Sequence, residues 1–173
     1  MKTWFMLTLV GQDRPGIVAA VSQALFEENC NLGEASMVRL GGNFSIMMMV
    51  QTGGGREALR DRVTAVAGPM GLTVHVDAIE GRLHQHVEPN LRISVYGADR
   101  PGIIAEVTKA LGDVGFNIVD LESDVGGTGG KPIFIMHIEG VAPGGMEAVE
   151  AVLKELRKKN VEIHVAPLDT LMG

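Results

Sequence analysis

The sequence is poor in aromatic residues and has almost no cysteine. Phe, Trp and Tyr make up 4% of its 173 residues, so a folded core must be built from Val, Ile, Leu, Met and Ala. The single cysteine, Cys30, excludes an internal disulfide and fits a reducing cytoplasm. No apolar run approaches the roughly 18 residues that a membrane span needs. We therefore expect a cytoplasmic protein that does not bind membranes.

An excess of positive charge is also missing. The formal net charge is −6, with 7 basic and 8 acidic side chains in residues 1–86, and 8 and 13 in residues 87–173. Proteins bind duplex DNA through Lys and Arg contacts that release counterions. We therefore expect no direct binding of nucleic acid, and any role in gene control would act through a protein partner. The 46% of apolar residues is typical of a globular protein.

An internal repeat is the strongest feature of the sequence. The segment Gly11–Val21, which reads Gly-Gln-Asp-Arg-Pro-Gly-Ile-Val-Ala-Ala-Val, returns 86 positions later as Gly-Ala-Asp-Arg-Pro-Gly-Ile-Ile-Ala-Glu-Val. The register then holds without a gap to Asn31 and Asn117. Such a repeat indicates a duplicated domain. We predict a first domain at residues 1–83, a linker at 84–90 that contains Pro89, and a second domain at 91–173.

Each half has the pattern of a strand, a helix, two strands, a helix and a strand. The alternation of Leu91, Ile93 and Val95 with polar residues is typical of a strand with one buried face. We expect strands at 3–10, 32–40, 44–51 and 72–78, then 91–96, 118–125, 133–139 and 161–165, and later helices at 56–70 and 146–158. This order predicts an α+β protein of two tandem ferredoxin-like βαββαβ domains, with antiparallel sheets and the helices on one face.

The helix after each Asp-Arg-Pro-Gly sequence has recognisable ends. Pro15 and Pro101 suit the first helical position, where no N–H is needed. Asn29 and Gly115 suit the left-handed residue that follows a helix. The expected core stripes are Val18, Val21 and Leu25, and their counterparts Ile104, Val107 and Leu111.

Some strands are apolar at consecutive positions. Residues 47–49 are all Met, and residues 133–136 read Ile-Phe-Ile-Met, so both faces of these strands carry apolar side chains. An uncovered sheet face of this kind favours association. We predict that the sheets of the two domains pair, or that the chain forms a homodimer.

The sequence around each repeat resembles the ACT domain, a small-molecule-binding regulatory module of amino-acid metabolism. The resemblance rests on a strand that ends in Gly-x-Asp-Arg-Pro-Gly-Ile, an amphipathic helix, and an Asn about 15 residues after the last Gly. A free-standing tandem pair resembles the glycine cleavage system transcriptional repressor group. The resemblance implies a non-catalytic regulator that binds an amino acid at an interface between ACT domains. The contacts would come from the loop after the first strand and from the start of the second strand.

The residue types of this loop suit an amino-acid ligand. Backbone N–H groups at a helix N-terminus favour a carboxylate, and an arginine can hold a carboxylate through two parallel hydrogen bonds. The aspartate could accept a hydrogen bond from an ammonium group. The expected ligand-binding residues are Gln12, Asp13, Arg14, Pro15, Gly16, Ile17, Asn31 and Leu32, and in the second copy Ala98, Asp99, Arg100, Pro101, Gly102, Ile103, Asn117 and Ile118. Because Gln12 is replaced by Ala98, the two sites need not bind equally.

The same residues also allow a structural interpretation. An aspartate before Arg-Pro can organise a loop and cap a helix, and an asparagine can fix a turn. The chain would then be a ligand-free interaction module, or a detached regulatory subunit of an amino-acid biosynthetic enzyme. The expected function remains that of a sensor of a small amino acid such as glycine or serine. It would act on a protein partner, with transcriptional control of glycine cleavage as one expected role.

Other clusters point less clearly to a function. They are the pair His84 and His86, the carboxylates Asp120, Glu122 and Asp124, and the glycine-rich stretches 53–55 and 126–130. Two histidines are too few for a metal site, alternating carboxylates are typical of a solvated strand with a weak cation site as the alternative, and the glycines lack the Lys of a phosphate loop. No nucleophile and base repeat between the copies. We therefore expect no enzyme, no metal and no cofactor.

Overall fold

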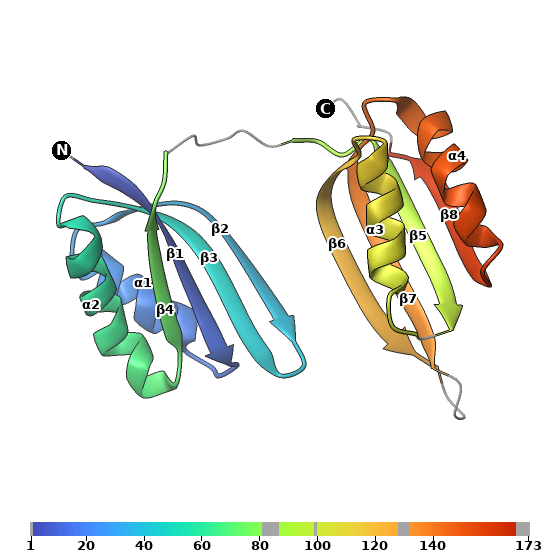
Figure 1. Ribbon diagram of the computed structural model, residues 1–173. Helices are drawn as coiled ribbons and strands as arrows, with labels where there is room; N and C mark the ends of the chain where they lie inside the picture. Colours follow the sequence, from blue (N-terminus) through green and yellow to red (C-terminus); the bar gives the residue numbers. More distant parts are fainter. Residues whose placement is uncertain (1, 81–86, 99, 128–131, 169–173) are drawn as a thin grey trace. The chain divides into compact units, whose positions relative to one another are not determined.

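The computed structural model describes residues 2–80, 87–98, 100–127 and 132–168. The chain divides into two compact units, Met1–Gln85 and His86–Gly173 (Figure 1). The predicted linker at 84–90 falls partly outside the described residues.

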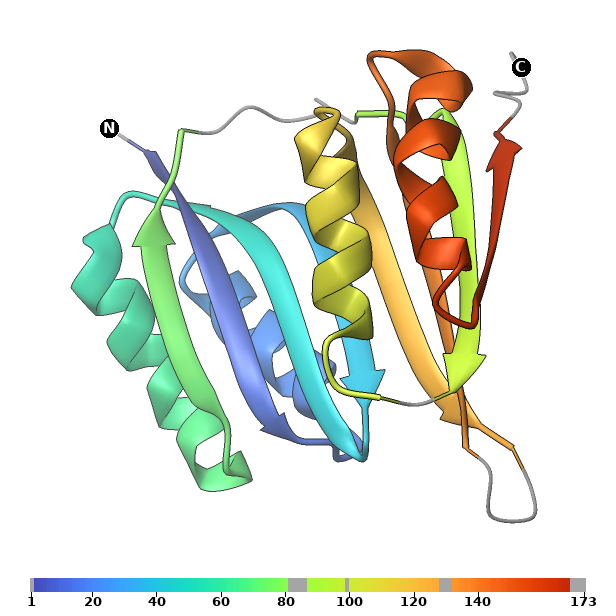
Figure 2. The same cartoon turned by 45° about the vertical axis from the view of Figure 1, so that its right-hand side comes forward.

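The first unit is a four-stranded antiparallel sheet with two helices on one face. Its elements are β1 (Thr3–Gln12), α1 (Ile17–Glu27), β2 (Asn31–Leu40), β3 (Asn43–Thr52), α2 (Gly55–Ala67), the short 3-10 helix η1 (Gly68–Met70) and β4 (Thr73–Ala78). The strand order is β2-β3-β1-β4, and neighbouring strands are antiparallel. Figure 2 shows α1 and α2 on the same side of this sheet.

The second unit repeats this architecture. Its elements are β5 (Leu91–Ala98), α3 (Ile103–Asp113), β6 (Asn117–Gly126), β7 (Ile133–Val141), α4 (Gly145–Arg157) and β8 (Val161–Pro167), with the strand order β6-β7-β5-β8. The predicted fold class, two tandem ferredoxin-like βαββαβ domains, is therefore confirmed. Both first strands are two residues longer than predicted, and they end at Gln12 and Ala98 beside the predicted loops.

The first helix of each unit begins later than predicted. Gly16 and Gly102 both have a φ of 89°, and each occupies the position just before its helix. The prediction that Pro15 and Pro101 take the first helical position is wrong. The chain enters each helix through a left-handed turn that glycine adopts without strain, whereas proline has a fixed φ near −65°. Pro15 and Pro101 lie in this turn, one residue before its glycine and outside the helix.

This entry turn also shifts the buried stripe of each helix. Val18 and Ile104 were predicted to lie in the core, but they are 41% and 40% exposed. The buried residues are instead Ile17, Val21, Ala24 and Leu25 in α1, and Ile103, Val107 and Leu111 in α3. Because the residue directly after the glycine turns inward, the next residue points outward.

The predicted helix ends are confirmed. Asn29 and Gly115 follow α1 and α3 with φ values of 54° and 71°. The β2–β3 hairpin turns at Gly41 and Gly42, which also have positive φ angles. Two consecutive positive φ angles are what a tight two-residue hairpin requires.

Each unit has its own hydrophobic core between the sheet and the helices. The fully buried side chains include Leu7, Leu9, Leu25 and Val63 in the first unit, and Ile93, Leu111, Met136 and Leu153 in the second. Each such side chain stabilises its unit by about 1.5–3 kcal/mol relative to exposure. On the opposite faces, Met47 and Ile133 remain 47% and 48% exposed. The predicted pairing of sheets or of chains stays a prediction.

Candidate ligand-binding loops

The loop after β1, residues 13–16, lies beside the tip of the β2–β3 hairpin. The end of β1 pairs with the start of β3 through Gln12 and Asn43. The backbone N–H of Asp13 donates a hydrogen bond to the carbonyl oxygen of Gly42 at 3.1 Å. The loop backbone is therefore attached to the hairpin turn on one side and to α1 on the other.

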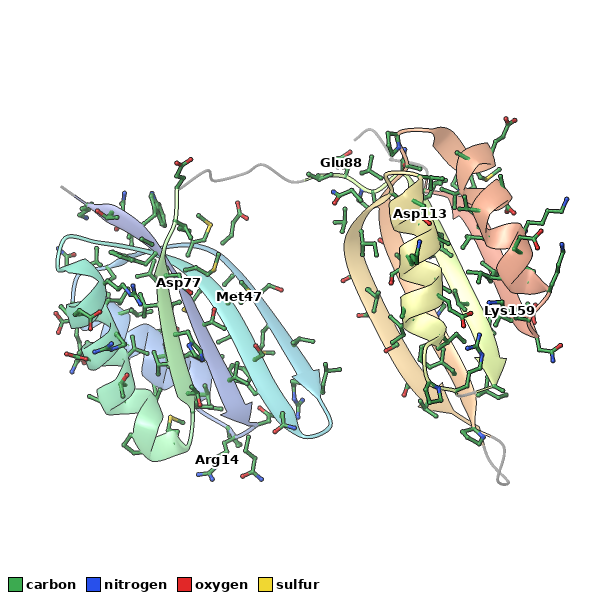
Figure 3. All side chains as sticks on the ribbon, viewed as in Figure 1. Arg14, Met47, Asp77, Glu88, Asp113 and Lys159 are labelled. Atoms are coloured by element: carbon green, nitrogen blue, oxygen red, sulfur yellow. The ribbon has the colours of Figure 1, made fainter. Side chains whose placement is uncertain are left out.

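The charged side chains of this first loop have unequal surroundings. The Asp13 carboxylate forms an ion pair with the Arg39 guanidinium at 2.5 Å, and the Asp13 side chain is only 23% exposed. Arg14 is exposed, and within the described residues its side chain has no ion pair and no hydrogen bond. Figure 3 shows Arg14 at the outer end of the loop. The first loop thus has one unpaired cationic group.

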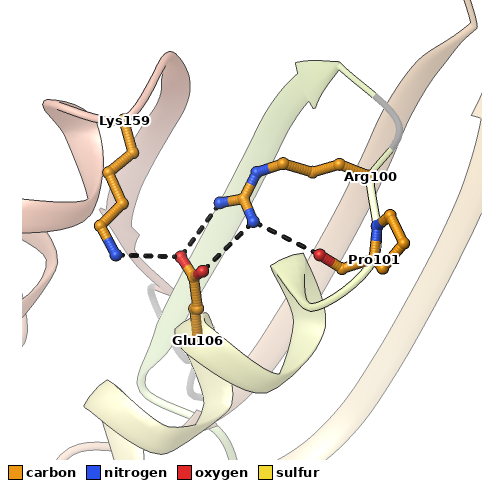
Figure 4. Close-up of polar contacts among 4 residues, drawn as sticks. All are labelled: Arg100, Pro101, Glu106 and Lys159. Carbon is orange, nitrogen blue, oxygen red and sulfur yellow. Dashed lines mark hydrogen bonds and ion pairs between the residues drawn. The ribbon is translucent and has the colours of Figure 1, made fainter.

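The second loop follows β5 and includes residues 100–102, and its arginine is already paired. The Arg100 guanidinium donates to both carboxylate oxygens of Glu106, at 3.0 and 3.2 Å, and to the carbonyl oxygen of Pro101 at 3.4 Å. The ammonium of Lys159 lies 3.5 Å from the same carboxylate (Figure 4). The predicted residue Asp99 lies outside the described residues. In the second loop, both terminal nitrogens of the Arg100 guanidinium are therefore already bound to a carboxylate.

The pairing of Arg100 with Glu106 shifts the pKa of both groups. The hydrogen bond from Arg100 holds the pKa of the Glu106 carboxyl below its usual range, and Lys159 acts in the same direction. The same hydrogen bond raises the pKa of the Arg100 guanidinium. Both groups are therefore charged at neutral pH, as their geometry requires.

Neither first helix is capped by a side chain. The residues at the N-cap positions, Gly16 and Gly102, have no side chain that could cap the helix. Their carbonyl oxygens accept the first helical hydrogen bonds from the backbone N–H groups of Ala20 and Glu106, at 2.9 Å. The alternative that Asp13 caps α1 is not met, since its carboxylate contacts Arg39 instead. An uncapped helix N-terminus can accept an anion.

The second loop borders two shallow pockets. A pocket of about 440 Å³ is lined by Arg100, Pro101, Gly102, Ile103, Ile104, Ala105 and Phe134. A larger one of about 760 Å³ lies along the end of β5 and includes Ala98, Ile133 and Arg157. Four of the predicted binding residues thus line the first pocket, and Ala98 lines the second. Either pocket exceeds the size of a small amino acid.

The predicted asparagine lies at the other end of the sheet. Asn31 pairs with Gln51, and Gln51 pairs in turn with Trp4 near the start of β1. The loop follows Gln12, eight residues further along β1, which corresponds to roughly 26 Å at the usual rise of a strand. The Asn31 amide donates to the Gln51 side chain at 3.1 Å. Asn31 and its neighbour Leu32 therefore do not meet the loop of their own unit.

The second unit shows the same separation. Asn117 and Ile118 pair with Val141 and Gly140, whereas the end of β5 pairs with Ile133 at the far end of β7. In a strand–helix–strand segment the helix returns the chain to the end where the first strand began. The two strands therefore run in the same direction, and both start at the same end of the sheet. That separation could have been deduced from the predicted order of elements. The loop and the strand start of one unit therefore do not meet within that unit.

Two residues near the loops were not predicted, namely Arg39 and Glu106. Both could have been noticed from the repeat, because 86 positions separate Ala20 from Glu106 and Arg39 from Val125. Each copy therefore has one charged residue that the other lacks. These two residues decide which loop charges are paired.

The outer face of the second sheet carries a polar cluster. Arg92 donates to Glu139 at 2.8 Å, Ser94 and His137 lie 3.0 Å apart, and Asp120 and Glu122 complete a pocket of about 270 Å³. Within the described ranges, no group of three or more His, Cys, Asp or Glu side chains is arranged to hold a metal ion. His84 and His86 lie outside those ranges. In the described part of the chain, no helix is long and apolar enough to cross a membrane.

Comparison with protein families gives a match in each half. A family model for the ACT domain matches residues 3–77, and a second ACT domain model matches residues 91–160. Among curated relatives, the UPF0237 protein YjhC of Lactococcus lactis is 32% identical over 83 residues, which are 46% of this chain and 95% of that protein. The UPF0237 protein MK1213 of Methanopyrus kandleri is 42% identical over 45 residues, which are 26% of this chain and 50% of that protein.

Solved structures share the fold over almost the whole chain. An unknown protein from Galdieria sulphuraria has a TM-score of 0.79 at 24% identity, and the match covers 98% of this chain and all of that one. A protein described as a candidate glycine cleavage system transcriptional repressor has a TM-score of 0.69 at 18% identity, with 98% and 99% of the two chains covered. At these identities the likeness concerns the fold.

Proposed function

Because the chain belongs to the ACT-domain family and consists of two such domains in tandem, we propose that it is a non-catalytic regulatory protein that senses a small amino acid. Glycine and serine are the first candidates. Occupancy of the site is passed to a protein partner. The observation that carries this proposal is the first loop, where an unpaired arginine stands beside an uncapped helix N-terminus.

The first loop supports the binding of a carboxylate. Arg14 offers a guanidinium that can hold both carboxylate oxygens. The first turn of α1 adds backbone N–H groups and the positive end of the helix dipole. The negative charge of Asp13 is balanced by Arg39, so the group of three has a net charge of +1. A small carboxylate is the anion that matches this charge and size.

The site is proposed to be completed by a second ACT domain. The start of β2, with Asn31 and Leu32, lies at the far end of its own sheet and is available to a loop from elsewhere. The asparagine amide can donate to or accept from a ligand. Either the other domain of the chain or a second chain would supply this half.

The expected affinity suits a metabolite sensor. Very small ligands gain at most about 1.5 kcal/mol per non-hydrogen atom. Glycine has five such atoms, so the best possible dissociation constant is on the order of a few micromolar. A sensor of this affinity would respond to changes in a metabolite pool and would release the ligand during purification.

The signal is proposed to reach a protein partner through exposed apolar side chains. Phe26 on α1 is 75% exposed, and Leu40 at the end of β2 is 67% exposed. Phe26 lies near the C-terminal end of α1, the helix that follows the loop, and Leu40 lies at the end of β2, next to the hairpin turn that contacts the loop. The fold shared with the candidate glycine cleavage repressor makes regulators and enzymes of glycine metabolism the first partners to test.

Calorimetry of the purified, ligand-free chain against the twenty amino acids tests the proposal. Glycine, serine or a related small amino acid is expected to bind, and Arg14→Ala is expected to abolish measurable binding. Arg56→Ala, which removes an exposed arginine from the start of α2, is the matched control and should bind as the wild type does. If the folded protein binds none of the twenty, the proposed function is wrong.

The second candidate is an interaction module that binds no metabolite. The exposure of Phe26 and Leu40 favours it, since such side chains are typical of a contact surface. Replacement of Asp13 and Asp99 by Ala separates the two functions. Unchanged partner binding together with an unchanged response to metabolites would support the module, including the version in which the chain is a detached regulatory subunit.

A further inference from the structure

The two copies of the loop differ in what occupies their arginines. Arg14 and Arg100 hold the same place in the repeat, yet Arg14 is unpaired among the described residues and Arg100 is bound to Glu106. The difference comes from one helix position. Glu106 is the fourth residue of α3, and the fourth residue of α1 is Ala20.

The Glu106 carboxylate takes the place that a ligand carboxylate would take. It accepts hydrogen bonds from both terminal nitrogens of the Arg100 guanidinium, at 3.0 and 3.2 Å (Figure 4). This is the two-pronged geometry by which arginine recognises carboxylates. A guanidinium bound in this way has its end-on pair of donors occupied, and only the side pair formed by Nε and Nη2 remains for another acceptor.

The charges around the second loop are already paired with one another. Glu106 adds a negative charge beside the helix start, and Lys159 only partly offsets it from 3.5 Å. In the first loop the added residue is the cation Arg39, which neutralises Asp13. Its counterpart in the second copy is Val125, which has no charge. The first loop therefore leaves its arginine without a carboxylate partner among the described residues, whereas the arginine of the second loop already has one.

We infer that Glu106 is an internal occupant of the second loop, so that the first loop alone binds the amino-acid carboxylate with full affinity. This inference deepens the proposed function and rests on it. Release of Glu106 would convert its loop into a second site.

Reactivity of the two arginines tests the pair without any ligand. Phenylglyoxal modifies accessible guanidinium groups, and mass spectrometry of peptides gives the rate at each position. In the folded full chain, Arg14 is expected to react up to about fivefold faster than Arg100, the factor that an exposed ion pair can supply. Glu106→Ala should raise the rate at Arg100 to that of Arg14.

Matched variants separate this effect from general changes of the helix. Asp113→Ala breaks the Lys109–Asp113 pair at the other end of α3 and should leave the rate at Arg100 unchanged. In the first copy, Ala20→Glu should slow the reaction of Arg14 by a similar factor. Gln23→Glu adds the same charge one turn further along α1 and should not slow it.

Calorimetry with glycine and with serine completes the test. The wild type is expected to show one site per chain, Ala20→Glu to weaken it about fivefold or more, and Glu106→Ala to add a second site. Equal reactivity of Arg14 and Arg100 in the wild type, or equal loss of binding in Arg14→Ala and Arg100→Ala, would overturn the inference while leaving the sensor function intact. If the reactivities differ as expected but none of the twenty amino acids binds, the internal pair stands and the sensor function fails.

Discussion

The loops that follow β1 and β5 share the sequence Asp-Arg-Pro-Gly and the same glycine conformation at the helix start, with a φ of 89° in both. Their electrostatics are nevertheless different. Arg39 neutralises the aspartate of the first loop, and Glu106 neutralises the arginine of the second. Two residues outside the repeated motif therefore decide whether a free cation remains. The Asp-Arg-Pro-Gly motif determines the backbone conformation of both loops, and the residues outside it, Arg39 and Glu106, determine which charges are paired.

The packing behind the loops differs as well. Phe116 and Gly140 of the second unit stand where the first unit has Cys30 and Val50. The second unit therefore has a larger side chain at the first of these positions and none at the second. Gly11 lies tightly against the η1–β4 connection, whereas its counterpart Gly97 has ordinary contacts. The two copies thus reach one fold through different local packing, and each difference can be tested separately.

The largest expected effect is that of Gly140→Ala on the second unit. A Cβ at this position would lie 2.2 Å from the carbonyl oxygen of Asn117 and 2.5 Å from the Phe116 ring. The backbone oxygen cannot move aside cheaply, so we expect the unit to lose about 3 kcal/mol. Scanning calorimetry should show a lower unfolding midpoint for one unit only.

Two further variants sharpen this result. Gly112→Ala lies inside α3 with open space around it and should stabilise the second unit by up to about 1 kcal/mol. Phe116→Cys combined with Gly140→Ala removes the ring contact, so the double variant should be destabilised by less than the sum of the two single variants. An unchanged midpoint in Gly140→Ala would refute the close packing at this strand.

The next effect compares Gly11→Ala with Gly97→Ala. A Cβ at Gly11 would lie 2.8 Å from the carbonyl oxygen of Gly71 and from the Leu72 side chain, whereas at Gly97 the nearest atoms are 3.5 Å away. We expect Gly11→Ala to destabilise the first unit by about 2 kcal/mol, because overpacking costs on the order of 1–3 kcal/mol. Gly97→Ala should change the second unit little. Chemical denaturation of both variants would measure this, and equal losses would contradict the difference.

A smaller effect is expected for Arg39→Ala. Its ion pair with Asp13 is partly exposed, so the stability of the first unit should fall by less than about 1 kcal/mol. The uncompensated Asp13 carboxylate would then repel a ligand carboxylate and compete for Arg14. Calorimetry should show weaker binding of glycine or serine, by roughly fivefold. Arg60→Ala, an exposed arginine of α2, is the control, and an equal loss in both variants would disprove a specific role of Arg39.

The smallest effect concerns pH. The hydrogen bond from Arg100 lowers the pKa of Glu106, so this carboxylate stabilises the second unit at neutral pH. The contribution disappears as the pH falls through the lowered pKa of the folded state. The unfolding midpoint of Glu106→Gln should therefore lie slightly below that of the wild type at neutral pH and approach it in acid. If the difference between the two unfolding midpoints widened as the pH fell, the ion pair of Glu106 with Arg100 would be contradicted. The first unit has no counterpart of this effect, because it has Ala20 at the equivalent position.

Much of the fold could be predicted because its signals are local. Strand alternation and the left-handed residues Asn29 and Gly115 each act within a few residues, and both signals are found as expected. The prediction of which side of α1 and α3 faces the core was partly wrong. The predicted stripe placed Val18 in the core, because sequence spacing alone does not show that the glycine turn sets the first inward residue.

The sequence by itself determined the duplication, the order of the elements and the position of both loops, because these depend on residues close together along the chain. Only the tertiary structure decided which loop keeps a free arginine, since Arg39 reaches Asp13 from a distant strand and the first turn of α3 directs Glu106 onto Arg100. It also placed Asn31 at the far end of the sheet from its own loop. Such pairings depend on where separate elements come together in space, and the pattern within a single element does not contain that information.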